Sequence, residues 1–400
     1  MSDIVILANF CYDFSAADNG RFLYLAKMLA EKHDVEIITS DFYHIDKCFR
    51  NKAADKWPFR ITFLHECGYP RNVCLKRFYS HYIWGKSVKK YLEKRKKPDV
   101  IYSAVPSLSA PLVAAKYCER NDIRFVIDVQ DLWPEAFQMV VNIPVVSDIV
   151  FLPFKIMVDG IYKRADEICA VSQTYVDRAL KVNKKCKSGV SVYLGTNLST
   201  FDKNAWDNKV ERPDDGRLRL AYCGTLGSSY DLTCVIDALA LVRKRGIQPP
   251  EFIVMGDGPA RKQFEEYSRA KNVDAEFLGR LPYDKMCGML KACDITVNPI
   301  THGAAQSIIN KHADYAASGL PVLNTQEGNE YRKLVKKYEM GLNCINNNYE
   351  DLANKLIYLL QNPDIRIKMG KNARKCAIEL FDRSSSYRII EKIIDNDWRE

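Results

Sequence analysis

The feature that most constrains the fold of this chain is a regular alternation of short apolar runs with longer segments of helical periodicity. The apolar runs of the first half lie at residues 3–10, 34–40, 98–104, 123–129 and 167–172. Between them, segments such as 19–32 and 110–121 carry apolar residues at helical spacing. Short strands that alternate with helices in this way predict a parallel β-sheet covered by helices on both faces.

The alternation stops once and then starts again. Residues 204–217 are polar and contain Pro and Gly, which is typical of a linker. Further apolar runs and a helical segment follow, at residues 218–224, 232–246, 251–259, 295–300 and 321–325. We therefore expect an α/β protein with two doubly wound, Rossmann-like domains that face each other across a cleft. Ligands of such sheets bind at the carboxyl ends of the strands.

Composition narrows the class of protein. A length of 400 residues is enough for two domains, and 47% hydrophobic with 27% charged residues is typical of a soluble globular protein. The chain opens on an apolar strand pattern rather than a signal peptide, so we expect the 13 Cys to be reduced, mostly buried and cytoplasmic. No apolar run is long enough to predict a membrane-spanning helix. The six His show no metal-ligand spacing, and we expect neither a metal nor another cofactor.

The net charge of +9 is unevenly distributed. Residues 71–97 contain ten Lys and Arg against one acidic residue, Glu93, and their aromatic and aliphatic side chains recur at helical spacing. This pattern is typical of a solvated helix with a core-facing stripe. The second interpretation is a basic amphipathic surface that binds anionic lipid or a lipid diphosphate. Nucleic acid is not an expected partner, because no nucleic-acid-binding motif accompanies the charge.

A second segment is suited to a membrane surface. Residues 137–158 are largely apolar, but Pro144, Pro153 and the charges of Asp148 and Lys155 argue against a membrane span. A segment of this composition is able to lie on a bilayer surface instead.

The segment IINKHADYAASGLPV, residues 308–322, places a polar cluster inside a short predicted helix. Ser307 is suited to cap the N-terminus and the Gly-Leu-Pro sequence to end the helix, which predicts a helix over residues 308–318. Ser307, Lys311 and Asp314 then share one face. The helix N-terminus and the ammonium of Lys311 favour an anion, and Asp314 is able to accept hydrogen bonds from paired hydroxyls. A diphosphate with its ribose satisfies both, and the alternative is a surface salt bridge between Lys311 and Asp314.

Five short motifs follow one another in the second half of the chain. They are YCGTLG, GDGP, FLGRLP, ACDITVNP and KHADYAASGLPV, at residues 222–227, 256–259, 277–282, 292–299 and 311–322. In this order they resemble the C-terminal half of the GT-B glycosyltransferases, in particular the large retaining family usually numbered four. In the first half, DVQDLWPEA at residues 128–136 resembles a branch of that family that builds bacterial surface polysaccharides.

The resemblance implies an architecture and an activity. Residues 1–203 are expected to form an acceptor-binding domain, residues 204–382 a nucleotide-sugar-binding domain, and residues 383–400 a last helix that packs back on the first domain. The implied activity is retaining transfer of a hexosyl or N-acetylhexosaminyl group from a nucleotide sugar, in the first instance a UDP-sugar, to a hydroxyl without a metal.

The resemblance also implies site residues. The predicted catalytic residues are Lys311 for the diphosphate, Gln306 for the donor sugar and Asp131 on the acceptor side. The predicted donor-binding residues are Gly224, Thr225, Gly227, Arg280, Ser307, Ile308, Asp314, Gly20 and Arg21. The chain departs from the family pattern at Gln306 and Asp314, where Glu is usual, and at Thr225, where Arg is frequent.

The implied acceptor is a glycan or a polyprenyl-diphosphate-linked saccharide of capsule or O-antigen synthesis. The protein is then expected in the cytoplasm, either without membrane contact or in peripheral contact with the anionic inner face of the cell membrane.

Two alternatives share this architecture. One is a nucleotide-sugar 2-epimerase, and the other is a nucleotide-sugar-binding scaffold that the uncharged Gln306 has made inactive.

Overall fold

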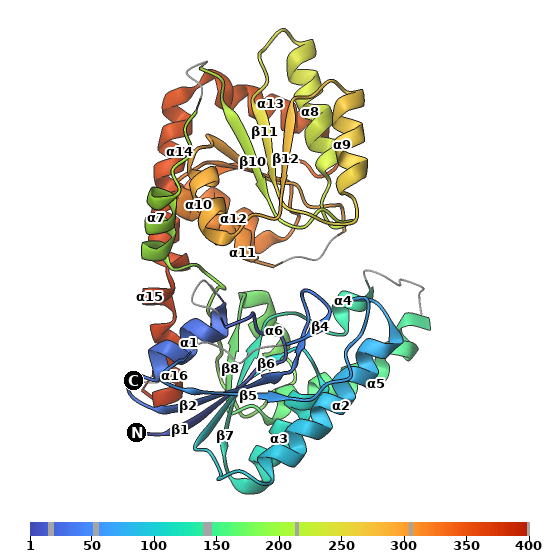
Figure 1. The fold of residues 1–400 in the computed structure, drawn as a ribbon, viewed down its shortest axis with the longest axis vertical. Coiled ribbons are helices and arrows are strands. Elements are labelled where there is room, and N and C mark those ends of the chain that lie inside the picture. Colours follow the sequence, from blue (N-terminus) through green and yellow to red (C-terminus); the bar gives the residue numbers. More distant parts are fainter. Residues whose placement is uncertain (15–19, 51–55, 139–145, 213–215, 304–306, 398–400) are drawn as a thin grey trace. The chain divides into compact units, whose positions relative to one another are not determined.

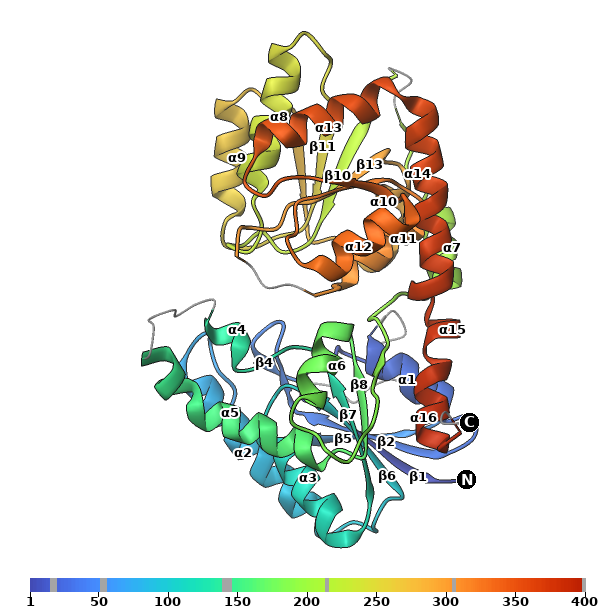
Figure 2. The same cartoon turned by 180° about the vertical axis from the view of Figure 1, so that it is seen from behind.

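The computed structural model describes residues 1–14, 20–50, 56–138, 146–212, 216–303 and 307–397. The chain folds into two compact units, each built on a parallel sheet with helices (Figures 1 and 2). The first unit consists of Met1–Val192 together with Tyr387–Glu400, and the second unit consists of Tyr193–Ser386. The chain therefore passes between the units twice.

The unit boundaries differ from the domain limits expected from the sequence. The expected limit after residue 203 falls inside α7 (Leu198–Asp207), which belongs to the second unit. The physical reason is packing, because Leu198 and Phe201 of this helix are buried in the core of that unit. Helix α16 (Arg388–Asp395) belongs to the first unit, where its isoleucines pack in the core.

The first unit contains a seven-stranded parallel sheet in the order β5-β2-β1-β6-β7-β8-β9. Its strands are β1 (Asp3–Leu7), β2 (Asp34–Ser40), β5 (Arg60–Leu64), β6 (Val100–Val105), β7 (Arg124–Val129), β8 (Glu167–Ala170) and β9 (Val190–Ser191). A separate antiparallel pair consists of β3 (Phe42–Tyr43) and β4 (Cys48–Phe49). Besides α16, the helices are α1 (Arg21–Leu29), α2 (Leu75–Leu92), α3 (Ser109–Asn121), α4 (Glu135–Gln138), α5 (Val146–Arg164) and α6 (Gln173–Leu180).

The second unit contains a six-stranded parallel sheet in the order β12-β11-β10-β13-β14-β15. Its strands are β10 (Arg219–Cys223), β11 (Glu251–Met255), β12 (Ala275–Gly279), β13 (Ile295–Asn298), β14 (Val322–Asn324) and β15 (Gly341–Asn343). Besides α7, the helices are α8 (Leu232–Lys244), α9 (Arg261–Ala270), α10 (Tyr283–Lys291), α11 (Asn310–Ser318), α12 (Asn329–Tyr338), α13 (Tyr349–Gln361), α14 (Pro363–Cys376) and α15 (Arg383–Ser386), with a π-helical turn at Ala377–Phe381.

The central strands explain why the apolar runs of the sequence predict the sheets. All residues of β6 and four of the five in β10 are buried, as expected for strands covered by helices on both faces. The sheets therefore confirm the doubly wound fold predicted from the apolar runs. Strands β5, β9 and β15 were not predicted, because they lie at sheet edges, are only partly buried and lack a continuous apolar run.

Each sheet has a point where the order of the strands reverses. In the first sheet this point lies between β1 and β6, and in the second sheet it lies between β10 and β13. The connections after the two strands then leave toward opposite faces, and the crevice at their carboxyl ends is where doubly wound sheets bind ligands.

Most of the 13 Cys are buried, as predicted. Within the described segments, no helix combines the length and the apolar character that crossing a bilayer requires.

Candidate functional site

Two loops meet at the carboxyl ends of β10 and β13 in the second unit. The backbone N–H of Asp231 donates to the carbonyl oxygen of Pro299 at 2.8 Å, and that of Thr301 donates to the carbonyl oxygen of Ser229 at 3.1 Å. These bonds join the two loops at the point where the strand order reverses. The loops therefore form a defined backbone surface at the place where a ligand is expected.

Glycines allow the backbone segments around this surface to approach closely. Gly224 has a φ of +144°, a conformation that L side chains rarely adopt. A Cβ at Gly256 would lie 1.8 Å from the carbonyl oxygen of Gly224, and a Cβ at Gly258 would lie 2.4 Å from that of Leu226. The GDGP motif is therefore a support for the loop after β10.

Helix α11 is attached to the same edge of the sheet. The hydroxyl of Tyr315 accepts a hydrogen bond from the N–H of Cys223 at 2.8 Å and donates one to the carbonyl oxygen of Val297 at 3.2 Å. One side chain thus bridges the ends of β10 and β13. This bridge places the first turn of α11 beside the loop that follows β10.

The helix begins later than the sequence pattern predicts. It starts at Asn310 with Ile309 as the N-cap, so the predicted start at residue 308 and the predicted cap at Ser307 are wrong. The ring Nδ1 of His312 accepts a hydrogen bond from the N–H of Ile309 at 3.2 Å, which ties the first turn to the residue before the helix. Gly319 ends the helix in a left-handed conformation with a φ of +72°, as predicted.

Lys311 lies in the first turn of α11 and is only 8% exposed. Its Nζ lies 4.3 Å from the ring centre of Tyr222 and 3.8 Å from that of Tyr230, and a Cβ on Gly224 would lie 2.7 Å from it. Among the described residues, Nζ has neither a hydrogen-bond partner nor an acidic side chain at ion-pair distance. Burial therefore lowers the pKa of Lys311 to about 7. The alternative of a surface salt bridge with Asp314 is wrong, because the ammonium is buried and unpaired.

Asp314 faces α10, whereas Lys311 faces the loop after β10. The Oδ1 of Asp314 accepts a hydrogen bond from the hydroxyl of Tyr283 at 3.0 Å, and that hydroxyl lies 2.6 Å from the Oγ1 of Thr196. Burial raises the pKa of Asp314 to about 6. Thr196 lies in the segment by which the chain enters the second unit, so Asp314 links α11 to that segment.

The other predicted residues of this loop lie at its surface. Thr225 is exposed, and a Cβ at Gly227 would meet nothing closer than the methyl group of Thr225 at 3.8 Å. In the part of the chain that the structure describes, the N–H groups of Thr225, Gly227 and Ser228 have no acceptor. Arg280 is exposed and directly follows β12.

Three predicted residues precede α11. Gln306 lies outside the described residues. Ser307 is partly buried, and its Oγ has no hydrogen-bond partner among the described residues, whereas its carbonyl oxygen accepts from the Nε2 of Gln326 at 3.1 Å. Ile308 is 2% exposed and packs in the hydrophobic core of the second unit. Its side chain is therefore a packing element, and a contact with the donor through the backbone of this residue stays a prediction.

In the first unit, Arg21 has a set of internal hydrogen-bond partners, and its predicted contact with the donor stays a prediction. Its Nε and a terminal nitrogen donate to the two carboxylate oxygens of Asp128 at 2.8 and 3.1 Å, and both side chains are buried. The other terminal nitrogen donates to the hydroxyl of Tyr387 and to the carbonyl oxygen of Val192, each at 3.1 Å. Gly20, the N-cap of α1, is also buried. The guanidinium thus connects α1 and β7 with the end of the unit's first chain segment at Val192 and the start of its second segment at Tyr387.

Asp131 lies just beyond the carboxyl end of β7. Its Oδ1 accepts from the N–H of Leu132 at 2.9 Å and its Oδ2 accepts from the indole N–H of Trp133 at 3.2 Å. Burial raises the pKa of this carboxyl group. The residue is partly buried, and its bonds shape the loop in which it lies.

Sequence reasoning missed the tyrosines that build the surroundings of Lys311 and Asp314. Tyr222 and Tyr230 lie on either side of the glycine loop. Tyr222 is near the end of β10 and Tyr230 precedes the N-cap of α8, and these positions in the sequence could have predicted that both tyrosines lie at the site. Tyr283 and Tyr315 have no such signal, because their partners lie in distant parts of the chain.

Comparison with known proteins finds a family that matches the region around Lys311. Residues 202–376 match the family described as glycosyl transferases group 1. The matched residues include Lys311, its tyrosine neighbours and all the motifs of the second half.

Similar proteins extend the match. An uncharacterized glycosyltransferase of Methanocaldococcus jannaschii is 22% identical over 236 residues, which are 59% of this chain and 59% of that protein. The chain thus matches less than two thirds of the length of that relative. Sucrose-phosphate synthase from Thermosynechococcus elongatus has a TM-score of 0.77 at 16% identity, with 99% of each chain covered. HepE of Anabaena in complex with UDP-glucose has a TM-score of 0.69 at 15% identity, with 99% of this chain and 100% of that chain covered. The structural matches confirm the predicted GT-B fold.

Proposed function

We propose that this chain transfers a sugar from a UDP-sugar to a hydroxyl group of a glycan or lipid-linked saccharide, with retention at the anomeric carbon. The observation that carries the proposal is the buried, unpaired ammonium of Lys311 at the end of β10 in a matched glycosyltransferase domain. The similar structure of HepE was solved in complex with UDP-glucose, which supports UDP as the nucleotide.

The proposed chemistry is electrostatic. Departure of the nucleoside diphosphate builds negative charge on its oxygens, and charges fixed in advance stabilise it without reorganisation. Lys311 supplies a full positive charge, the N-terminus of α11 supplies about half a charge, and the N–H groups of Thr225 and Gly227 supply hydrogen bonds. In this scheme the leaving phosphate takes the proton of the acceptor hydroxyl, attack occurs on the same face, and no metal ion is required.

The remaining predicted residues have proposed roles in binding. Asp314 accepts hydrogen bonds from the ribose, with Tyr283 holding its carboxylate in place. Gln306 contacts the donor sugar, and Arg280 lies near the base or phosphate. On the acceptor side we propose Asp131, and the motif that contains it supports a saccharide of capsule or O-antigen synthesis, with hexosyl or N-acetylhexosaminyl transfer.

A donor screen followed by product analysis tests the proposal. Nucleotide sugars are screened by thermal shift, because a ligand that binds the folded state raises the melting temperature by mass action. Each donor that binds is then incubated alone and with saccharide acceptors. Transfer supports the proposal, an epimer from donor alone assigns a 2-epimerase, and binding with neither transfer nor hydrolysis assigns a scaffold. Absence of any shift with UDP-sugars contradicts the proposed donor.

The lowered pKa of Lys311 predicts that donor binding depends on pH. The free group is half protonated near its pKa of about 7, and a bound diphosphate stabilises the charged form and raises that pKa. Binding then takes up a proton, so affinity falls as the pH rises above about 7, by up to about tenfold per pH unit. Calorimetry with UDP-glucose, whose diphosphate does not titrate in this range, measures the effect. Lys311→Met should abolish the dependence, and a flat profile for the unmodified chain contradicts the electrostatic role.

We also propose that α2 and α5 contact an anionic membrane. Figures 1 and 2 show the two helices side by side, and the ring centres of Phe78 and Phe154 lie 4.9 Å apart. Large apolar side chains on or beside these helices are at least half exposed, namely Val73, Leu75, Tyr79, Tyr82, Ile149, Val150, Leu152 and Ile156. Exposed Lys76, Lys86 and Lys155 accompany them. Apolar side chains for the acyl boundary and basic ones for anionic headgroups are the two requirements of peripheral binding.

Vesicle sedimentation tests this surface. The unmodified chain is expected to bind phosphatidylglycerol vesicles at low salt, with weaker binding at high salt because the attraction is screened. Leu75→Ser combined with Ile156→Ser should weaken binding at least tenfold, because each removes an exposed aliphatic side chain worth about 1.5–3 kcal/mol when fully buried. Trp206→Ser is the matched control, since Trp206 is 83% exposed but lies in the second unit. Recovery of all the protein in the supernatant at low salt contradicts the membrane contact.

A further inference from the structure

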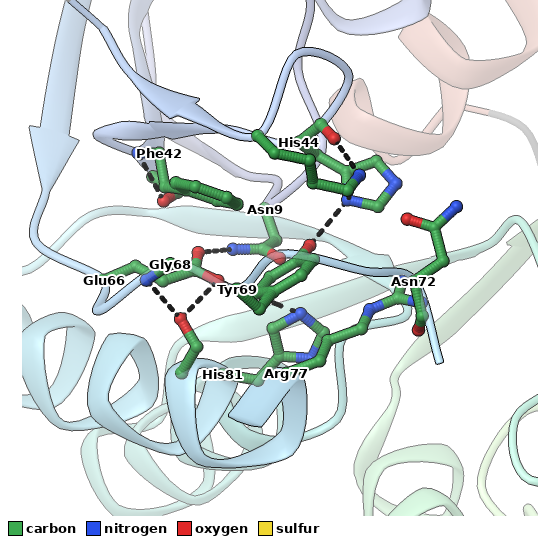
Figure 3. A network of polar contacts seen from close by, with 12 residues as sticks. Asn9, Phe42, His44, Glu66, Gly68, Tyr69, Asn72, Arg77 and His81 are labelled. Atoms are coloured by element: carbon green, nitrogen blue, oxygen red, sulfur yellow. Dashed lines mark hydrogen bonds and ion pairs between the residues drawn. The ribbon is translucent and has the colours of Figure 1, made fainter. Parts of the chain in front are cut away.

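Basic and aromatic side chains gather at the carboxyl ends of the strands in the first sheet. Asn9 follows β1, His44 and Lys47 lie between β3 and β4, and Arg77 and His81 lie in α2 (Figure 3). The same edge of the second sheet carries Lys311. A doubly wound sheet binds its ligands at this edge, so the cluster lies where a second ligand of the protein is expected.

Arg77 lies among aromatic rings. Its guanidinium carbon lies 5.5, 5.5 and 4.7 Å from the ring centres of Phe10, Tyr69 and Trp133. Among the residues that the structure describes, no carboxylate lies at ion-pair distance from it, and its Nε has no hydrogen-bond partner. A terminal nitrogen donates to the carbonyl oxygen of Asn72 at 2.8 Å. Burial lowers the pKa of Arg77, which indicates that its charge is incompletely compensated.

Lys47 brings a second cation to the same place. Its Nζ donates to the carbonyl oxygen of His44 and lies 3.4 Å from the Nδ1 of that ring, and no acidic side chain in the described residues pairs with it. Burial and then repulsion by Arg77 lower the pKa of Lys47. Burial, Lys47 and Arg77 together lower the pKa of His44 to about 3, so this ring is neutral. Two cations thus lie close enough to repel each other, and no carboxylate among the described residues forms an ion pair with either of them.

Helix α2 begins against the usual electrostatic rule. Its first turn contains Lys76 and Arg77 and no acidic residue, and no side chain caps it at Cys74. The positive end of the helix dipole therefore meets two like charges, an arrangement with an electrostatic cost. A bound anion removes this cost, because the dipole and both side chains then act in its favour. Local rules are commonly broken in this way at functional sites.

His81 supplies a second, independent indication of a ligand. It lies one turn after Arg77 and is 3% exposed, and its ring stacks on that of Trp133 with centres 5.8 Å apart and planes at 20°. Within the described chain its Nε2 has no hydrogen-bond partner, and the Oε1 of Glu66 is 3.9 Å away. That carboxylate already accepts hydrogen bonds from Asn9, as Figure 3 shows, and from the hydroxyl of Ser80. A buried ring nitrogen without a partner is available to an oxygen of a ligand.

We propose that Arg77, Lys47 and His81 bind a phosphate group, which the acceptor carries as a phosphate or diphosphate ester. Two cations match the double negative charge of a phosphate, and a guanidinium matches its paired oxygens. Asp131, the residue proposed on the acceptor side, is close enough to Arg77 to raise the pKa of that guanidinium. The identity of the ligand as an acceptor rests on the proposed function, whereas the binding of a phosphate group does not.

Calorimetry with inorganic pyrophosphate tests the site. The unmodified chain is compared with Arg77→Gln, Lys47→Gln and Lys311→Met, and with Lys90→Gln as a matched control because Lys90 is exposed on the same helix. We expect Arg77→Gln and Lys47→Gln to weaken one binding event at least tenfold, and Lys90→Gln and Lys311→Met to leave that event unchanged. Lys47 lies in a turn and is partly exposed, so its variant keeps the test decisive if Arg77→Gln does not fold.

The outcomes separate this inference from the proposed function. Pyrophosphate binding that Lys311→Met abolishes and that Arg77→Gln and Lys47→Gln leave intact overturns the inference but not the glycosyltransferase. Arg77-dependent pyrophosphate binding in a chain that shows no donor binding and no transfer supports the phosphate site and contradicts the proposed function.

Two further ligands identify the source of the phosphate. Arg77-dependent binding of a soluble sugar 1-phosphate shows that the phosphate group alone is recognised. Arg77-dependent binding of a short-chain polyprenyl-diphosphate saccharide, without binding of the sugar phosphate, assigns the site to a lipid-linked acceptor. Binding of both ligands that is insensitive to Arg77→Gln and Lys47→Gln overturns the inference.

Discussion

Lys311→Met is expected to lower sugar transfer at least tenfold without destabilising the protein. The substitution removes the positive charge that meets the leaving diphosphate, and a tenfold loss corresponds to about 1.4 kcal/mol of transition-state stabilisation. The free energy of unfolding should stay equal or rise. The ammonium is buried beside Tyr222 and Tyr230, and no anion in the described chain offsets the cost of its desolvation. The measurements are kcat/KM with the donor found in the screen and the melting temperature of the free protein.

A matched variant separates this effect from a general loss of charge. Lys285→Met removes an exposed lysine of α10 in the same unit and should leave both quantities unchanged. Undiminished transfer by Lys311→Met would remove the residue from the mechanism. A large fall in melting temperature would instead show that the lysine is structural, contrary to its lack of partners.

Asp128→Ala is expected to destabilise the first unit by about 3–5 kcal/mol, because it leaves the guanidinium of Arg21 buried without its counter-charge. The double variant Arg21→Met with Asp128→Leu should recover much of the loss, since it removes both charges and fills the space. Chemical denaturation, followed through the transition of the first unit, measures the difference in unfolding free energy.

An exposed ion pair provides the comparison. Lys203 and Asp207 are paired in α7, but their side chains are 74% and 47% exposed. Breaking that pair with Lys203→Ala should cost no more than about 1 kcal/mol, because solvent screens the attraction. Equal effects of Asp128→Ala and Lys203→Ala would contradict the buried network described for Arg21.

The strands illustrate how much of the fold the sequence could predict. β1, β6 and β10 lie inside their sheets and are buried on both faces, so each appears as an apolar run. β5 and β15 lie at sheet edges and are only partly buried, so nothing in their composition separates them from loops. Burial on both faces, rather than strand formation itself, is what made a strand predictable.

The candidate site was predictable only in part. The position of Lys311 near a helix N-terminus followed from local spacing, but its burial between two tyrosine rings did not. Those rings belong to β10 and the loop after it, more than eighty residues earlier in the chain. Ile308 adjoins the polar cluster in sequence, yet its side chain points into the core. The start of α11 was misplaced because the bond from the N–H of Ile309 to the ring of His312, rather than a serine hydroxyl, marks the beginning of the helix.

By itself, the sequence determined the two doubly wound sheets, the order of their motifs and the edge at which ligands are expected. These features follow from local periodicity and from the positions of glycines, and both depend only on residues that are close together in the sequence. The tertiary structure alone decided which charges are paired. Arg21 meets a carboxylate 107 positions away, whereas Lys311 and Arg77 meet none in the described chain. The physical reason is that burial and the distance to a counter-charge fix the energy of a charge, and both quantities depend on segments that folding brings together from distant parts of the chain.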